Sequence, residues 1–273
     1  MNNVDIERIE IDLLLEALFQ AHGYDFRSYA RASVARRLQN FLSLTGHGHI
    51  SELIPQALHD RAFFSRLVQH FSIAVTEMFR DPFVYRTLRE QVIPRLHSYP
   101  HAKIWCAGCA TGEEVYSLAI LLKEEELLER TTLYATDFNE DALEQAGQGI
   151  FPLSRMKLYT ANYQKAGGKN SFSDYYRADY NSAVMNDALK RQITFASHNL
   201  TADGVFGEMQ LVICRNVLIY FNQELQNRAL KLFTDSLVHG GFLCLGTAES
   251  LAFSAVAENY KEVDKEARLY KRI

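Results

Sequence analysis

The sequence predicts an α/β fold, a parallel sheet with helices on both faces, preceded by an all-helical domain. From residue 102 onward, short apolar runs typical of strands alternate with helical segments, which is the pattern of a parallel sheet covered on both sides. Before residue 98, apolar residues recur at helical spacing instead. The last stretch, 260–273, reads as two short strands in a hairpin. This hairpin would add an antiparallel edge to the sheet.

The composition indicates a folded protein without a membrane anchor. Apolar residues make up 48% of the 273 residues, enough to fill a core, so disorder is excluded. A net charge of −4 and a pI near 6.1 argue against nucleic acid as a partner. Charges between Asp5 and Glu10 interrupt the first apolar run, and no run of about 18 apolar residues occurs. We therefore expect a cytoplasmic protein with no direct membrane insertion.

Two domains are expected, 1–98 and 99–273. The boundary is placed at the stretch 97–103, because Pro100 disfavours helix before it and a strand follows. A polar stretch at about 159–191 lacks strand or helix patterning and is expected to be a loop-rich insertion. Helices of the first domain are predicted within 11–23, 28–46 and 57–71. Strands of the second domain are predicted within 102–107, 131–137, 192–198, 209–215 and 240–247, and helices within 113–130, 139–150 and 222–240.

A glycine turn with two cysteines follows the first predicted strand, in "WCAGCATGEEVYS". Cys106 and Cys109 have the spacing of half a zinc site, but no second pair completes the four ligands, so no metal is expected. The other two cysteines, Cys214 and Cys244, end apolar strands and are expected in the core.

Phosphate is also disfavoured at this turn. Gly112 is followed by Glu113 and Glu114 where a phosphate-binding loop would carry lysine and a hydroxyl residue. Two carboxylates at a helix N-terminus would repel a phosphate. A nucleoside with positive charge and no phosphate remains, and Asp137 at the end of the second strand suits its ribose hydroxyls. S-adenosylmethionine meets all these conditions.

Five motifs, in this order, resemble those of chemotaxis receptor methyltransferases, the CheR family. They are "VTEMFRDP", "TGEEVYS", "ATDFN", "SHNL" and "ICRNVLIYF". The resemblance covers nearly the whole chain. It implies a Rossmann-like methyltransferase sheet of about seven strands, an N-terminal helical domain and a small subdomain inserted late in the sheet. It further implies methylation of glutamate side chains on the cytoplasmic helices of chemoreceptors or a related chemosensory protein, with S-adenosylhomocysteine as the second product.

The resemblance also implies roles for single residues. The resemblance would place Tyr220 near the transferred methyl group, and the planar guanidinium of Arg80 suits it to orient the substrate carboxylate, so these two are the expected catalytic residues. Either Glu113 or Glu114 would meet the amino group of the cofactor. The cofactor-binding set that it implies is Thr76, Arg80, Ala107, Gly108, Glu113, Glu114, Asp137, Asn199, Leu200, Arg215 and Asn216.

The substrate side is expected on the second helix. Helical spacing places Val34, Leu38 and Phe41 on one face and Arg37 on the flank. The family uses a basic helix here, and Arg37 matches one of its receptor-contacting positions. Docking of a receptor tail peptide is not predicted, because the insertion shows no strand alternation. Two alternatives stay open: a non-catalytic adaptor that binds the cofactor or its product, and a methyltransferase for a small carboxylic acid.

Overall fold

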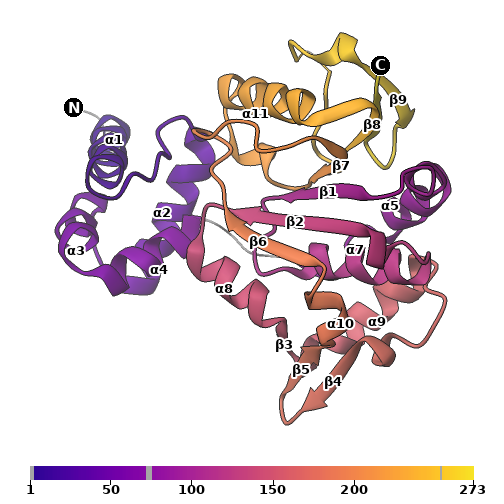
Figure 1. Ribbon diagram of the computed structural model, residues 1–273. Helices are drawn as coiled ribbons and strands as arrows, with labels where there is room; N and C mark the ends of the chain where they lie inside the picture. Colours follow the sequence, from indigo (N-terminus) through magenta and orange to yellow (C-terminus); the bar gives the residue numbers. More distant parts are fainter. Residues whose placement is uncertain (1–2, 72–75, 253) are drawn as a thin grey trace. The chain divides into compact units, whose positions relative to one another are not determined.

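The computed structural model describes residues 3–71, 76–252 and 254–273, in two compact units (Figure 1). The first unit comprises Met1–Ala74 together with the short segment Ile219–Gln226. The second comprises Val75–Leu218 and Asn227–Ile273. The chain therefore changes unit at residue 74 and returns briefly to the first unit near residue 220.

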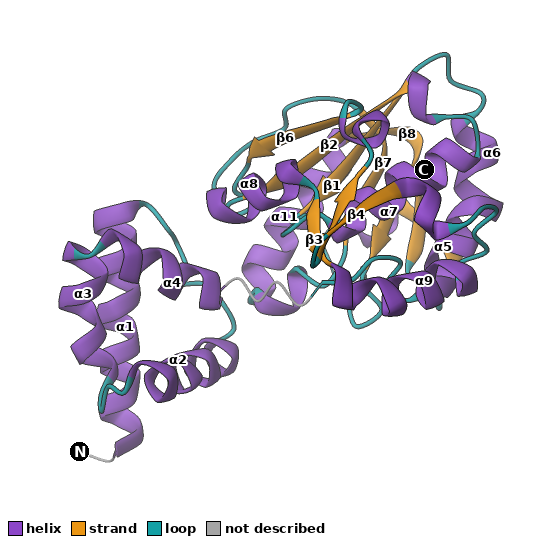
Figure 2. Cartoon of the chain, turned by 90° about the horizontal axis from the view of Figure 1, so that it is seen from below, coloured by secondary structure: helices purple, strands orange, loops and turns teal. Residues whose placement is uncertain are grey.

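The first unit is built from helices, which Figure 2 shows joined by short loops. Leu14, Leu15 and Leu18 of the first helix are fully buried at its core. The second helix ends at Gly46, whose φ of 74° is the left-handed conformation that glycine adopts readily. The elements are α1 (Asn3–His22), α2 (Arg31–Thr45), the 3-10 turn η1 (Ile50–Glu52), α3 (Leu53–His59) and α4 (Arg61–Phe71).

The second unit contains a seven-stranded sheet of order β6-β2-β1-β7-β8-β10-β9 (Figure 1). The first five strands of this order pair in parallel, and β10 pairs antiparallel with β8 and β9. The predicted parallel sheet with a closing hairpin is thus confirmed. The strands are β1 (Ala102–Ala107), β2 (Thr131–Asp137), β6 (Ile193–Ser197), β7 (Met209–Cys214), β8 (Leu237–Leu245), β9 (Tyr260–Asp264) and β10 (Leu269–Arg272).

Helices cover both faces of this sheet, and the side chains of β1 show how. Successive strand residues point to opposite faces. Ile104 and Cys106 belong to the core cluster that includes α7 (Glu113–Glu124). Trp105, between them, packs edge-to-face at 5.4 Å against Phe233 of α11 (Gln223–Ser236). The second unit also contains η3 (Leu128–Arg130), α8 (Glu140–Gln148) and η7 (Ala257–Asn259), and the chain returns to the first unit within η6 (Leu218–Tyr220).

Residues 82–96 belong to the second unit, which is why the units divide ahead of the expected boundary at residue 98. Val84, Leu88 and Ile93 are buried in the core cluster of the sheet. The segment is α5 (Pro82–Thr87), the π-helical turn η2 (Leu88–Val92) and α6 (Ile93–Leu96). Its helical periodicity resembles that of the preceding helices, so the sequence pattern alone did not separate the two.

The small inserted subdomain that the family resemblance implies is confirmed, but the loop-rich character expected at about 159–191 is wrong. The subdomain begins at Ile150 and carries a three-stranded antiparallel sheet of order β3-β5-β4. Strands of three or four residues are too short to show alternation, which explains the difference. Its elements are β3 (Ile150–Pro152), η4 (Leu153–Arg155), α9 (Met156–Lys165), η5 (Phe172–Tyr175), β4 (Tyr176–Asp179), β5 (Ser182–Met185) and α10 (Asp187–Lys190).

Across residues 3–71, 76–252 and 254–273, no helix combines the length and apolar character needed to cross a membrane.

Candidate active site

The glycine turn after β1 is fixed to the end of β2. The N–H groups of Gly108 and Cys109 both donate to the carbonyl of Thr136, at 2.8 and 2.9 Å. Gly108 has a φ of 75°, and a Cβ added there would lie 2.5 Å from Cγ2 of Val217. Glycine is therefore required for the turn to pack this closely.

Asp137, at the end of β2, ties the glycine turn to the following helix. Its carboxylate is 8% exposed and accepts the N–H of Ala110 at 2.9 Å and that of Asn139 at 3.0 Å. Burial raises the pKa of Asp137, and the backbone donors oppose this effect. The helix cap is Asn139, whose side chain accepts the N–H of Ala142. Asp137 is thus held in place without serving as the cap.

The two glutamates that begin α7 have different surroundings. Glu113 is buried, and its two oxygens accept from the hydroxyls of Thr111 at 2.6 Å and Tyr159 at 3.3 Å. Burial raises the pKa of Glu113. Glu114 instead accepts from Arg215 at 2.7 Å. Glu113 faces the insertion, and Glu114 joins a charged cluster.

That cluster, Asp81, Glu114 and Arg215, gathers residues from three separate segments. Arg215 lies one residue beyond β7, and its guanidinium donates to Asp81 at 2.6 Å and to Glu114 at 2.7 Å. Burial disfavours the charged form of Arg215, but the Glu114 carboxylate outweighs this and raises its pKa. Two carboxylates share one guanidinium, so the cluster carries a net charge of −1.

Arg80 stands between two residues with left-handed backbone. Phe79 and Asp81 have φ values of 53° and 54°. The N–H of Phe79 donates to the hydroxyl of Ser117 at 2.9 Å, and the carbonyl of Met78 accepts from Asn162 at 3.1 Å. Strained backbone of this kind persists where its surroundings hold it and is common at functional sites. Arg80 is half-buried, as is Thr76 earlier in the same segment.

A turn at Asn216 follows β7, and it depends on Glu249, a residue that sequence reasoning missed. Asn216 has a φ of 61°. One oxygen of buried Glu249 accepts both the N–H of Asn216 at 3.2 Å and that of Gly246 at 2.6 Å. Because Gly246 follows β8, this single oxygen joins the carboxyl ends of two neighbouring strands. In the sequence, the only signal for Glu249 was that an acidic residue follows the end of β8 by four positions.

The segment after β6 is also bound to Asp137. The N–H of His198 donates to the Asp137 carbonyl at 3.1 Å, and the ring of His198 packs edge-to-face against Trp105 at 5.2 Å. The side chain of Asn199 accepts from Thr201, and Leu200 is buried beside it.

The cysteines do not form a metal site. All four are free and buried, and within residues 3–71, 76–252 and 254–273 no group of three or more metal-ligating side chains occurs. Burial raises the pKa of the Cys106 and Cys109 thiols and takes that of Cys244 to about 12.

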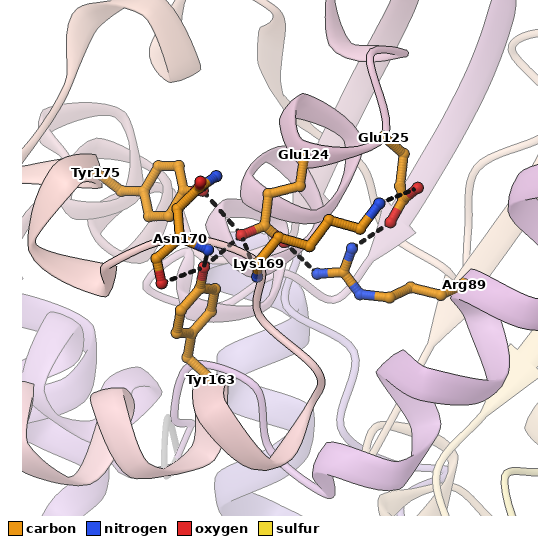
Figure 3. A network of polar contacts seen from close by, with 7 residues as sticks. All are labelled: Arg89, Glu124, Glu125, Tyr163, Lys169, Asn170 and Tyr175. Atoms are coloured by element: carbon orange, nitrogen blue, oxygen red, sulfur yellow. Dashed lines mark hydrogen bonds and ion pairs between the residues drawn. The ribbon is translucent and has the colours of Figure 1, made fainter.

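The insertion is anchored at both ends of α7. Tyr159 reaches Glu113 at its start, and a polar network surrounds Glu124 at its end (Figure 3). Burial would raise the pKa of Glu124, but its hydrogen bonds outweigh burial and lower it. The donors to Glu124 are the hydroxyls of Tyr163 and Tyr175, the N–H of Lys169 and the guanidinium of Arg89. The insertion therefore supports the helix that begins at the glycine turn.

Two expected residues, Arg37 and Tyr220, lie in the first unit. The surface position expected for Arg37 is wrong: its side chain is 2% exposed, and its guanidinium carbon lies 4.1 Å from the centre of the Tyr220 ring. Val34, Arg37 and Phe41 share the buried face of α2, whereas Arg36 is exposed. A receptor helix at the surface of α2 would therefore not meet Arg37.

The sheet order, the glycine turn and the acid at the end of β2 define the methyltransferase class of α/β fold. Residues 74–267 match the family model described as CheR methyltransferase, SAM binding domain, and residues 9–72 match the CheR methyltransferase all-alpha domain. The chain belongs to the CheR methyltransferase family, whose cofactor is S-adenosylmethionine. The acidic groups around the glycine turn suit the positive charges of this cofactor.

Three relatives illustrate the membership. The chain is 49% identical over 264 residues to a protein of Pseudomonas putida provisionally named methyltransferase Cher3, covering 97% of both chains. It is 28% identical to a chemotaxis protein methyltransferase of Listeria innocua, over 84% of this chain and 85% of the relative. It is also 31% identical to part of an uncharacterized 104.1 kDa protein of Rhodobacter capsulatus, over 87% of this chain but 25% of the relative.

Proposed function

We propose that this protein methylates glutamate side chains of chemoreceptors, or of a related chemosensory protein, to give glutamyl methyl esters. Relatives that share most of the chain are named chemotaxis protein methyltransferases. The observation that carries the proposal is the net negative cluster of Asp81, Glu114 and Arg215 beside the glycine turn. A negative cluster suits a cofactor that bears an ammonium and a sulfonium and no phosphate.

Within this proposal, Glu114 is the better partner for the cofactor's amino group. Glu113 is directed toward the insertion by its hydrogen bond from Tyr159. Glu114 shares Arg215 with Asp81, which leaves one negative charge for an ammonium. Asp137 would receive the ribose hydroxyls. The other proposed cofactor contacts are Thr76, Arg80, Ala107, Gly108, Asn199, Leu200, Arg215 and Asn216.

The transfer asks little acid–base chemistry of the chain. S-adenosylmethionine supplies the methyl group, and the carbon–sulfur bond breaks as the new carbon–oxygen bond forms. A glutamate carboxylate, with an ordinary pKa of about 4.3, is already ionised at neutral pH and requires no general base. The protein's task is to hold the carboxylate in line with the methyl group and to exclude water. We assign orientation of the carboxylate to Arg80, whose planar fork matches it, and a contact near the methyl group to Tyr220.

The proposed partners are the cytoplasmic helices of receptors, which places the reaction in the cytoplasm. The test uses radiolabelled S-adenosylmethionine and a soluble receptor fragment that contains the methylated region. We expect label that alkali releases as methanol, the signature of a methyl ester, and no label on a fragment whose candidate glutamates are changed to glutamine. Alkali-stable label, or equal labelling of both fragments, would contradict glutamate as the acceptor.

A further inference from the structure

A buried arginine without an ionic partner lies against the segment that carries Tyr220. Arg37 of α2 is 2% exposed. Among the described residues, none of its three guanidinium nitrogens has a hydrogen-bond partner. Its guanidinium carbon lies 4.1 Å from the centre of the Tyr220 ring, the geometry of a cation–π interaction. Burying a charge without hydrogen bonds is unfavourable, so this contact needs an explanation other than stability.

The chain around Tyr220 is held by the same unit as Arg37. The N–H of Ala30 donates to the Tyr220 carbonyl at 2.9 Å, and the N–H of Asn222 donates to the Ser28 carbonyl at 3.1 Å. Tyr29 and Phe221 form an antiparallel bridge, and their rings lie 5.2 Å apart. These contacts fix the backbone on both sides of Tyr220. Arg37 is the additional group that contacts its ring.

We infer that Arg37 is a positioning residue, which holds the ring of Tyr220 in its working orientation and does not contact the protein substrate from the surface. A planar guanidinium stacks on an aromatic face, whereas a lysine ammonium is a point charge with no plane to match. The contact restricts the tilt of the ring, and we expect it also to support the backbone bonds on either side of Tyr220. The inference rests on the proposed role of Tyr220 in methyl transfer.

The first test compares Arg37→Met, which keeps the bulk, and Arg37→Lys, which keeps the charge, with Arg36→Met as the matched control. Arg36 is the exposed neighbour on the same helix. With the receptor fragment as substrate, we expect Arg37→Met to lower kcat by about tenfold or more without raising KM. Arg37→Lys should recover part of this loss, and Arg36→Met should leave kcat unchanged. A rise in KM at constant kcat in Arg37→Met would show a substrate contact and overturn the inference.

A double-mutant cycle then asks whether Arg37 acts through Tyr220. If it does, Arg37→Met should have little further effect on kcat in a Tyr220→Ala background, because residues that act as a unit are not additive. Additive losses would overturn the inference and leave the proposed methyltransferase function intact. Unaltered kcat in Tyr220→Ala would remove the role of Tyr220 on which the inference rests.

Amide hydrogen exchange provides a readout that does not depend on activity. In Arg37→Met we expect faster exchange of the Ala30 and Asn222 amides, which bond across the Tyr220 segment. Arg36→Met should leave these amides unchanged. If the wild type methylates no receptor fragment, the proposed function fails, yet faster exchange would still support the contact. Unchanged exchange in Arg37→Met would overturn it.

Discussion

Arg37 and Arg215 are two buried arginines in different units of the same chain, and their surroundings are opposite. Arg215 pairs with Asp81 and Glu114 through both terminal nitrogens. Arg37 has no hydrogen-bond partner for its guanidinium among the described residues and lies over the ring of Tyr220 instead. Burial lowers the pKa of Arg37, whereas the partner Glu114 overcomes burial and raises that of Arg215.

The difference separates two uses of a buried charge. A paired guanidinium organises the carboxylates around it, and its removal leaves them without a counter-charge. An unpaired guanidinium contributes little to folding, so its retention points to function. Replacing these two arginines should therefore differ more in its effect on the free energy of unfolding than in its effect on activity.

The largest effect is expected for Arg215→Met. Removing one partner of a buried ion pair typically lowers the free energy of unfolding by about 3–5 kcal/mol. We expect a loss toward the lower end of this range, because Glu114 stays mostly buried without its counter-charge whereas Asp81 is 31% exposed. Urea unfolding followed by circular dichroism measures this loss. The control Lys231→Met breaks an exposed pair with Asp235 and should change stability by less than about 1 kcal/mol. Equal losses in the two variants would remove the distinction between the paired cluster and an ordinary surface pair.

Glu249 adds to the comparison a buried acid that accepts hydrogen bonds from two backbone N–H groups, those of Asn216 and Gly246. Glu249→Ala leaves the buried N–H of Gly246 without its acceptor, which should lower the free energy of unfolding by about 1–3 kcal/mol. Glu249→Gln keeps an oxygen that can accept the same bond, so it should lose clearly less. The same urea titrations measure both. If the two variants lose the same amount, the charge of Glu249 matters and not the bonds it accepts.

Arg37→Met should behave in the opposite way to Arg215→Met. Replacing an unpaired buried charge with an apolar side chain of similar length should leave the free energy of unfolding unchanged or raise it by up to about 2 kcal/mol. Thermal and urea unfolding measure this change. A loss above about 2 kcal/mol would show that Arg37 has a stabilising partner, and the contrast with Arg215 would fail.

The smallest effect is a pH dependence at Glu113. Burial raises the pKa of this residue above the ordinary value of 4.5. A carboxyl with a raised pKa in the folded state holds its proton more tightly there, so the folded state loses stability as the pH rises through and above 4.5. Glu113→Gln removes this contribution. We expect the variant to gain on the wild type as the pH rises, in urea titrations at several pH values. The exposed control Glu144→Gln should show no such trend.

Much of the fold follows from local patterns in the sequence. Alternating apolar runs and helices predicted the parallel sheet, and the closing hairpin was predicted from residues 260–273. The glycine turn and Asp137 were predicted because their positions at strand ends are set by short-range spacing. Gly108 bonds to the end of β2, next to Asp137, as a turn at the carboxyl edge of a sheet requires.

The positions of some site residues could not be predicted, because their contacts join parts of the chain that are distant in sequence. Arg37 lies three residues after Val34 and four before Phe41, which is helical spacing for the buried face, whereas it was expected on the flank at a receptor-contacting position. Glu249 accepts a hydrogen bond from Asn216, which lies 33 residues before it in the chain. Tyr159 donates to Glu113, which lies 46 residues before it. No local pattern encodes such pairs.

The most direct measurement is calorimetry with S-adenosylhomocysteine on the wild type, on Asp137→Ala and on the exposed control Glu144→Ala. We expect the wild type and the control to bind S-adenosylhomocysteine. We expect Asp137→Ala to bind it more weakly by about 1–3 kcal/mol, because the ribose hydroxyls lose a buried acceptor. Absence of wild-type binding, or equal binding by Asp137→Ala, would contradict the proposed cofactor site.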